Sequence, residues 1–276
     1  MIAPLQASDR AELNALLASH SYSSMYLRAG LHCPGDRSNF AVARHQGRIV
    51  AVAAHAASGM MLLQAPVDAG ALTIAVLGRT GRRLAGFLGP MDQVQAARSA
   101  MGLADADLRK NTHEDLFALT LSALRMPDAL AAGKVRCRVA VQADFDQLLA
   151  WRVAFRAAAL NDAPGAQLID TSRADVAALL PAGSLFMLES DTPLACCSFN
   201  ARLPDMVQIG NVWTPPALRG QGHGRSVVAG ALAIAAANGV TSAVLSTGRH
   251  NVAALAAYRG IGFELVGDYA TVTLAN

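Results

Sequence analysis

Two hydrophobic periods follow one another in the second half of the chain and predict its elements. Residues 206–209 (Met-Val-Gln-Ile) form a short apolar run that predicts a strand. Apolar residues then recur at helical spacing over 226–237, and Asn238-Gly239 supplies a helix stop. A glycine-rich stretch over 219–224 lies between the two. The pattern therefore predicts a strand, a glycine-rich loop and a helix N-terminus in immediate succession.

The first half of the chain shows a weak copy of the same order of elements. Matching segments lie about 145–160 residues apart, a self-similarity that indicates two copies of one domain rather than a solenoid. A stretch rich in Pro, Ala and Gly over 127–134 is the expected linker, which places the domains at 1–130 and 131–276. The predicted pairs are helices beginning at Ser8 or Asp9 and at Asp144, hairpins over 40–55 and 184–200, strands over 60–65 and 207–212, helices over 69–77 and 226–237, strands over 84–88 and 241–246, and helices over 92–100 and 251–258.

Composition limits the classes of protein that this chain can belong to. With 276 residues, 53% of them hydrophobic and 16% charged, it is long and apolar enough for two globular cores. No apolar run approaches the roughly 18 residues of a membrane span, and a net charge of +3 is too small to indicate nucleic-acid or membrane binding. Met1–Arg10 shows no signal-peptide pattern, so we expect a cytoplasmic protein.

The cysteines indicate neither a metal site nor a disulfide. Cys33, Cys137, Cys196 and Cys197 fit no zinc spacing, and no metal is expected. Cys196 and Cys197 are adjacent in a predicted strand and should face opposite sides of the sheet. We interpret all four as small buried side chains in a reducing compartment.

The loop before the second-half helix has the properties of an anion site. Free backbone N–H groups and the positive end of the helix dipole favour phosphate there, and Arg219 and Arg225 add charge. The spacing Gly220-x-Gly222-x-Gly224 is neither the nucleotide P-loop nor the dinucleotide fingerprint. On the loop alone, an ordinary strand-turn-helix connection is the simpler alternative.

Several motifs in the right order make the alternative less attractive. Arg219-x-x-Gly222-x-Gly224 resembles the pyrophosphate loop of the GNAT acetyltransferase superfamily, (Gln/Arg)-x-x-Gly-x-(Gly/Ala). The preceding Val-x-Thr-Pro run, the Ala-rich helix, the strand over 241–246, Asn251-x-x-Ala254-x-x-x-Tyr258 and the Gly-Ile-Gly-Phe run over 260–263 also fit that superfamily. The resemblance covers about residues 207–263.

This resemblance implies an α/β fold with a central mixed sheet in each of two tandem GNAT-like domains, and acetyl-CoA as the acyl donor. By resemblance, the pantetheine arm lies between the strands over 207–214 and 241–246, and the N–H near Val212 polarises the thioester carbonyl. Asn251 would contact the cofactor arm, although it is equally a helix N-cap. The residues implied in cofactor binding are Val212, Trp213, Thr214, Arg219, Gly220, Gln221, Gly222, His223, Gly224, Arg225 and Asn251.

Tyr258 is the catalytic candidate. A phenol within reach of the departing thiolate can protonate it as a general acid, whereas the structural alternative is a buried aromatic with a satisfied hydroxyl. The general base is not identified. Family members often carry a glutamate on the strand before the loop, where this chain has Gln208, and Asp205, Glu189, His223, a water chain or an amine that binds already neutral are the remaining options.

The first half lacks the loop that carries this chemistry. At the corresponding place it reads Pro66-Val67-Asp68-Ala69-Gly70, where Asp68 is a good N-cap and its carboxylate occupies the position of an anion. We interpret this half as a degenerate GNAT-like domain that no longer binds pyrophosphate. Its role would be structural, or to line the acceptor pocket.

The predicted activity is transfer of an acetyl or other short acyl group from acetyl-CoA to a primary amine by direct attack. The acceptor is a small molecule or peptide, bound around residues 151–162, and a homodimer is compatible with the sequence. Trp213 could also flank the acceptor or simply pack. The alternative is a non-catalytic acyl-CoA-binding or regulatory module, and a nucleotide-phosphate binder is a weaker third reading.

Overall fold

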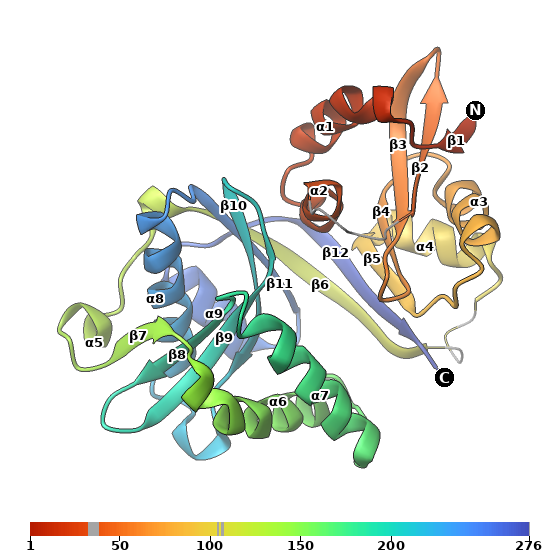
Figure 1. Cartoon of the computed structure of the whole chain (residues 1–276). Helices are drawn as coiled ribbons and strands as arrows, with labels where there is room; N and C mark the ends of the chain where they lie inside the picture. The colour runs from red at the N-terminus through yellow and green to blue at the C-terminus, as the bar shows by residue number, and fades with distance from the viewer. Residues whose placement is uncertain (33–38, 104, 106–107, 276) are drawn as a thin grey trace. The chain divides into compact units, whose positions relative to one another are not determined.

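The computed structural model describes residues 1–32, 39–103, 105 and 108–275 (Figure 1). The chain divides into two compact units. Unit 1 is Met1–Leu116 together with Leu265–Asn276, and unit 2 is Phe117–Glu264.

The units do not follow the boundary expected near residue 130. The strand Leu108–Thr120 runs from unit 1 into unit 2, and the last strand, Glu264–Leu274, returns to unit 1. There its Thr271 and Val272 pair with Leu88 and Phe87. The expected linker instead contains the short helix α5, Asp128–Ala131, inside unit 2.

Unit 1 is a mixed sheet with helices on both faces. Its strand order is β1-β2-β3-β4-β5-β12-β6. Strands β4 and β5 are parallel, whereas β1 to β4 pair antiparallel in sequence and β12 pairs antiparallel with β5. The elements of unit 1 are β1 Ile2–Pro4, α1 Arg10–Ser19, α2 Met25–His32, β2 Asn39–His45, β3 Arg48–His55, β4 Met60–Gln64, α3 Ala69–Thr80, β5 Gly86–Pro90, α4 Met91–Ala100, the first part of β6 Leu108–Thr120, and β12 Glu264–Leu274.

The alternation of side chains along the strands gives unit 1 two cores. On one face, Leu13 and Leu17 of α1 and Leu27 of α2 pack against Val42 and Val52. On the other face, α3 and α4 cover a second cluster that includes Phe87 and, from β12, Ala270 and Val272. The C-terminal strand is therefore part of the unit 1 core.

Unit 2 repeats this architecture. Its strand order is β6-β11-β10-β9-β8-β7, with β10 and β11 parallel and β7 to β10 antiparallel (Figure 1). The elements of unit 2, after the end of β6, are α5 Asp128–Ala131, β7 Arg136–Val139, α6 Phe145–Ala159, α7 Ala166–Leu179, β8 Leu185–Glu189, β9 Pro193–Arg202, β10 Met206–Trp213, α8 His223–Ala237, β11 Ser242–Gly248 and α9 Val252–Gly260.

The two faces of the unit 2 sheet have different coverings. Helices α8 and α9 share one buried cluster with Val207 and Ile209 of β10. Helices α6 and α7 share another cluster with Trp213 of β10. Cys197 belongs to the first cluster and Cys196 to the second, which confirms that they face opposite sides. Cys33 lies outside the described residues.

Most predicted elements form close to their expected positions. The structure starts α8 at His223, three residues before the predicted Ser226, because His223, Gly224 and Arg225 form its first turn. Asp68 does stand at the N-cap of α3, but its φ is 59° and its side chain makes no capping bond, so the predicted cap is wrong. Its backbone carbonyl accepts the Leu72 N–H at 2.8 Å instead.

None of the helices in the described part of the chain has the length and apolar character needed to cross a membrane.

Candidate active site

The sheet of unit 2 opens along the parallel pair β10–β11. The two strands are paired at Met206↔Ser242, Val207↔Ala243 and Gln208↔Val244. Beyond this point β10 continues to Trp213 and β11 to Gly248, but the two strands no longer pair with each other. The backbones of both strands are therefore available to a ligand at their C-terminal ends, before the helices α8 and α9 begin.

A bulge in β10 lies at the edge of this opening. Gly210 pairs with Ser198 and Trp213 pairs with Cys196, so two residues of β10, Asn211 and Val212, stand opposite the single Cys197. Asn211 has a φ of 52°, in the left-handed region. The bulge turns Val212 toward the α8 face, where it packs on the core, and Trp213 toward the α6 face.

The glycine-rich loop presents a run of unpaired donors. Gly220 and Gly222 adopt φ values of 80° and 79°, which L side chains rarely do, and Gly222 is the N-cap of α8. The first hydrogen bond of the helix is from the Ser226 N–H to the Gly222 carbonyl. Within the described chain, the backbone N–H groups of residues 220–225 have no hydrogen-bond acceptor. Six consecutive donors at a helix N-terminus suit the oxygens of a diphosphate.

The first turn of α8 lies against the end of β10. A Cβ atom placed on Gly224 would lie 3.6 Å from Thr214 Oγ1 and 3.9 Å from Val212 Cγ1. The structure thus brings Val212, Thr214 and Gly224 together. Gln221 and Arg225 are exposed beside them.

Arg219 and Trp213 form a separate contact. The Arg219 guanidinium carbon lies 4.9 Å from the centroid of the Trp213 ring, and its Nε donates to the Thr214 carbonyl at 3.1 Å. The Trp213 ring also meets Phe155 of α6 edge to face at 6.3 Å. The side chain of Trp213 therefore lies on the α6 face, on the opposite side of the sheet from Val212.

Helix α9 contributes the remaining predicted residues. Asn251 is its N-cap, with its side chain accepting the Ala254 N–H at 3.3 Å. Tyr258 is 8% exposed and packs in the α8-side core, 6.1 Å from the Phe263 ring. Its hydroxyl has no hydrogen bond with any other described residue. Burial, reinforced by the neighbouring Cys197 thiol, raises the pKa of Tyr258 well above its ordinary value, so the phenol stays protonated at neutral pH.

The candidate bases are poorly suited to that role. Hydrogen bonds from Arg136 and also Arg138 hold the pKa of Glu189 below its ordinary value. Asp205 precedes the start of β10, at the strand end opposite to the loop, where its carbonyl accepts the Thr241 and Ser242 N–H groups. His223 is half-buried in the first turn of α8.

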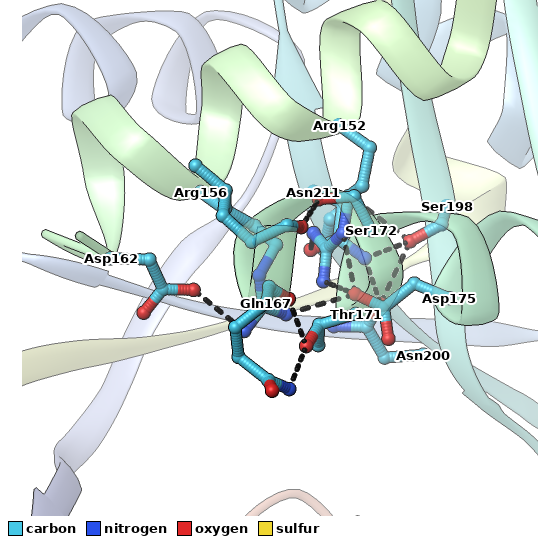
Figure 2. Close-up of polar contacts among 12 residues, drawn as sticks. Arg152, Arg156, Asp162, Gln167, Thr171, Ser172, Asp175, Ser198, Asn200 and Asn211 are labelled. Carbon is cyan, nitrogen blue, oxygen red and sulfur yellow. Dashed lines mark hydrogen bonds and ion pairs between the residues drawn. The ribbon is translucent and has the colours of Figure 1, made fainter. Parts of the chain in front are cut away.

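A polar cluster on the α6 face holds the bulge in place (Figure 2). Arg152 of α6 donates to Asn211 Oδ1 and, through Nε and Nη2, to Asp175 Oδ2 at 2.8 and 2.6 Å. The Asn211 amide nitrogen donates to Ser198 Oγ at 2.8 Å and to Asn200 Oδ1 at 2.9 Å. We call these five residues the Asn211 clamp.

A second arginine completes the charge balance around the clamp. Arg156 donates to Asp175 Oδ2 at 2.9 Å and pairs with Asp162 at 2.6 Å, so two guanidiniums face two carboxylates (Figure 2). Beside the clamp, a narrow apolar pocket lies between α6, α7 and β10. Its walls include Leu148, Trp151, Phe155, Val176, Leu179 and Trp213. The expected acceptor region over 151–162 contributes to these contacts.

The clamp makes a testable prediction about the bulge. Asn211→Gly keeps a residue that tolerates positive φ but removes the side-chain bonds, and we expect folding with about tenfold slower turnover because the bulge loses its support. Asn211→Leu should in addition lower the free energy of unfolding by about 2–3 kcal/mol, from backbone strain and unpaired polar groups. Urea unfolding and CoA release measure the two effects. Equal turnover in wild type and Asn211→Gly would contradict a positioning role for the clamp.

Unit 1 closes the equivalent place with its own atoms. After the parallel pairs of β4 and β5, the Ala65 N–H donates to Gln93 Oε1 of α4 at 2.6 Å. A Cβ on Gly70, in the first turn of α3, would lie 2.3 Å from the Ala100 Cβ. In unit 1 the backbone N–H after β4 is thus already bonded, and the space beside the first turn of α3 is already filled. Both are open at the corresponding places of unit 2, which supports the interpretation of unit 1 as a degenerate copy.

Comparison with known proteins agrees with this geometry. Residues 145–263 match the model of the acetyltransferase (GNAT) family. No curated protein is significantly similar to the chain. Among solved structures, a Drosophila protein is 13% identical with a TM-score of 0.65 over 99% of this chain and 98% of its own. A tandem GNAT protein from the clavulanic acid biosynthesis pathway is 16% identical, with a TM-score of 0.58 over 100% and 98%.

A GCN5-related N-acetyltransferase from Sphaerobacter thermophilus is also similar in fold, with 13% identity and a TM-score of 0.59 over 99% of this chain and 94% of its own. The family match indicates an enzyme of the acyltransferase class, and the solved structures share the fold. The match to the GNAT family model is confined to residues 145–263.

Sequence reasoning missed the Asn211 clamp. Its members come from α6, α7, β9 and β10, and only the tertiary fold brings them together. The available signal was weak: Asn is the non-glycine residue that most readily adopts a left-handed conformation, and Asn211 interrupts an apolar strand.

Proposed function

We propose that this chain is an N-acetyltransferase that transfers an acetyl or short acyl group from acetyl-CoA to a primary amine. The observation that supports this most directly is the row of six unpaired N–H groups at residues 220–225, next to strands that separate after Gln208. This combination provides a diphosphate site and a slot for an extended chain with amides.

Each residue of the site then has a role. The loop amides and Arg225 bind the diphosphate. The backbones of Val212 and Thr214, with Asn251, bind the pantetheine amides, and the Val212 N–H polarises the thioester carbonyl. Arg219 takes part in cofactor binding from its position over the Trp213 ring. Trp213 itself borders the acceptor.

The chemistry is one displacement. The amine lone pair forms the new C–N bond, the C–S bond breaks, Tyr258 gives its proton to the departing sulfur, and the amine loses its extra proton to water. Tyr258 carries the proton that this step needs, because a phenol is protonated at neutral pH and burial keeps it so. The cytoplasmic location and the homodimer stay predictions.

The test is release of free CoA. Incubation of the full chain with acetyl-CoA and a panel of small and peptide amines should produce thiol at a rate that depends on the amine. Calorimetric binding of CoA without turnover on any amine would instead support an acyl-CoA-binding module. Preferential binding of ATP over CoA would overturn both interpretations.

A further inference from the structure

Gln208 carries a buried amide that the fold does not use. The side chain is 8% exposed, and its Oε1 atom is buried without a hydrogen-bond partner among the described residues. Neither does its amide nitrogen bond to any described group. Unpaired buried amides are rare in native proteins, because an amide that loses its water without gaining a partner destabilises the fold.

The position of Gln208 explains where a partner could come from. Gln208 is the last residue of β10 that pairs with β11, so it stands where the two strands begin to separate. Its neighbours Val207 and Ile209 both belong to the α8-side core. By the alternation of a strand, Gln208 then faces the α6 side, as Trp213 and the Asn211 clamp do.

The two carboxylates described beside the clamp on this face are both engaged by arginines. Asp175 Oδ2 already accepts N–H bonds from Arg152 and Arg156, and Asp162 is paired with Arg156. An amide oxygen accepts a hydrogen bond but takes no proton at neutral pH. Gln208 can therefore orient a nucleophile through a hydrogen bond but cannot remove its proton.

We infer that the Gln208 amide binds the nitrogen of the acceptor, and that the acceptor is a weakly basic primary amine that arrives uncharged. This rests on the proposed function. An α-amine with a pKa of about 7.8 is roughly 14% neutral at pH 7, whereas a lysine ε-amine with a pKa of about 10.4 is about 0.04% neutral. Selection for the neutral form therefore favours α-amino groups and similar amines over alkylamines.

The experiment uses the full chain, saturating acetyl-CoA, and two probes: glycinamide for an α-amine and Nα-acetyl-lysinamide for an ε-amine. Wild type should prefer glycinamide at pH 7 by at least about tenfold in kcat/KM. Gln208→Leu should raise the KM for glycinamide about tenfold and leave the KM for acetyl-CoA unchanged. Its Tm should be equal or higher, since an unpaired amide is removed.

Gln208→Glu tests the same contact through pH. A carboxylate here supplies a proton acceptor, so turnover of the ε-amine at pH 7 should rise and its pH–rate profile should extend to lower pH. The matched control is Gln64→Leu in β4 of unit 1. Gln64 is a buried glutamine that has a partner, since Ser23 Oγ donates to its Oε1 at 2.8 Å. Its loss should lower stability without changing the amine KM.

The outcomes separate the two proposals. An unchanged KM for glycinamide in an active Gln208→Leu enzyme overturns the role of Gln208. Preference of the wild type for the ε-amine overturns the inferred class of acceptor. No turnover of any amine by the wild type overturns the proposed function itself, and the inference with it.

Discussion

Gly224→Leu is expected to abolish most of the affinity for CoA while leaving the protein folded. The residue lies in the first turn of α8, and its missing side chain keeps open the space beside Thr214 and Val212. A leucine there displaces the diphosphate from the loop amides. Loss of two charge-assisted hydrogen bonds, about 3 kcal/mol in all, predicts at least about a 100-fold increase in Kd.

The free energy of unfolding of Gly224→Leu should rise slightly, although the affinity for CoA falls. The neighbouring contacts of a Cβ at this position are ordinary, and leucine is a better helix former than glycine by up to about 1 kcal/mol. Calorimetry with CoA and urea unfolding measure the two quantities. The control is Gly78→Leu in α3, an exposed helical glycine with nothing near its Cβ, which should leave CoA affinity unchanged. Undiminished binding by Gly224→Leu would remove the loop from the cofactor site.

Tyr258→Phe is expected to lower kcat by about 10²- to 10⁴-fold, the usual contribution of a general acid. The KM for acetyl-CoA should change little, because only the hydroxyl is removed. That hydroxyl bonds to none of the other described residues, so the free energy of unfolding should stay within about 0.5 kcal/mol of the wild type. Stopped or continuous thiol assays measure kcat.

The pH dependence of kcat follows from the direction in which the pKa of Tyr258 is shifted. Since burial raises the folded-state pKa of Tyr258, the donating form is fully present at neutral pH and is lost only as the pH rises past that raised value. No alkaline limb below about pH 10 should therefore come from this group. The control is Tyr269→Phe, a tyrosine equally buried in unit 1, which should keep full kcat. An unchanged kcat in Tyr258→Phe would remove this residue from the mechanism.

Local patterns were sufficient to predict the elements around the loop. The hairpin over 40–55, the strand ending at Trp213 and the helix capped by Asn251 all depend on neighbours in the chain. The start of α8 was predicted three residues late, because glycines have low helix propensity and their role as a first turn depends on contacts with β10. The positive φ of Asp68 was likewise not predicted, because Asp is usually an N-cap with extended backbone.

By itself, the sequence determined the mixed α/β fold, its duplication and the similarity of residues 145–263 to the GNAT family, since these follow from periodic burial and from a loop whose glycines lie close together in the chain. The tertiary structure alone decided that β12 belongs to unit 1, that unit 1 closes its own cleft through Gln93, and that Asn211 is held by Arg152. The physical reason is that these features depend on pairing between distant segments. The packing of the whole unit determines which strands pair and which side chains come into contact. A local pattern of residues does not contain this information.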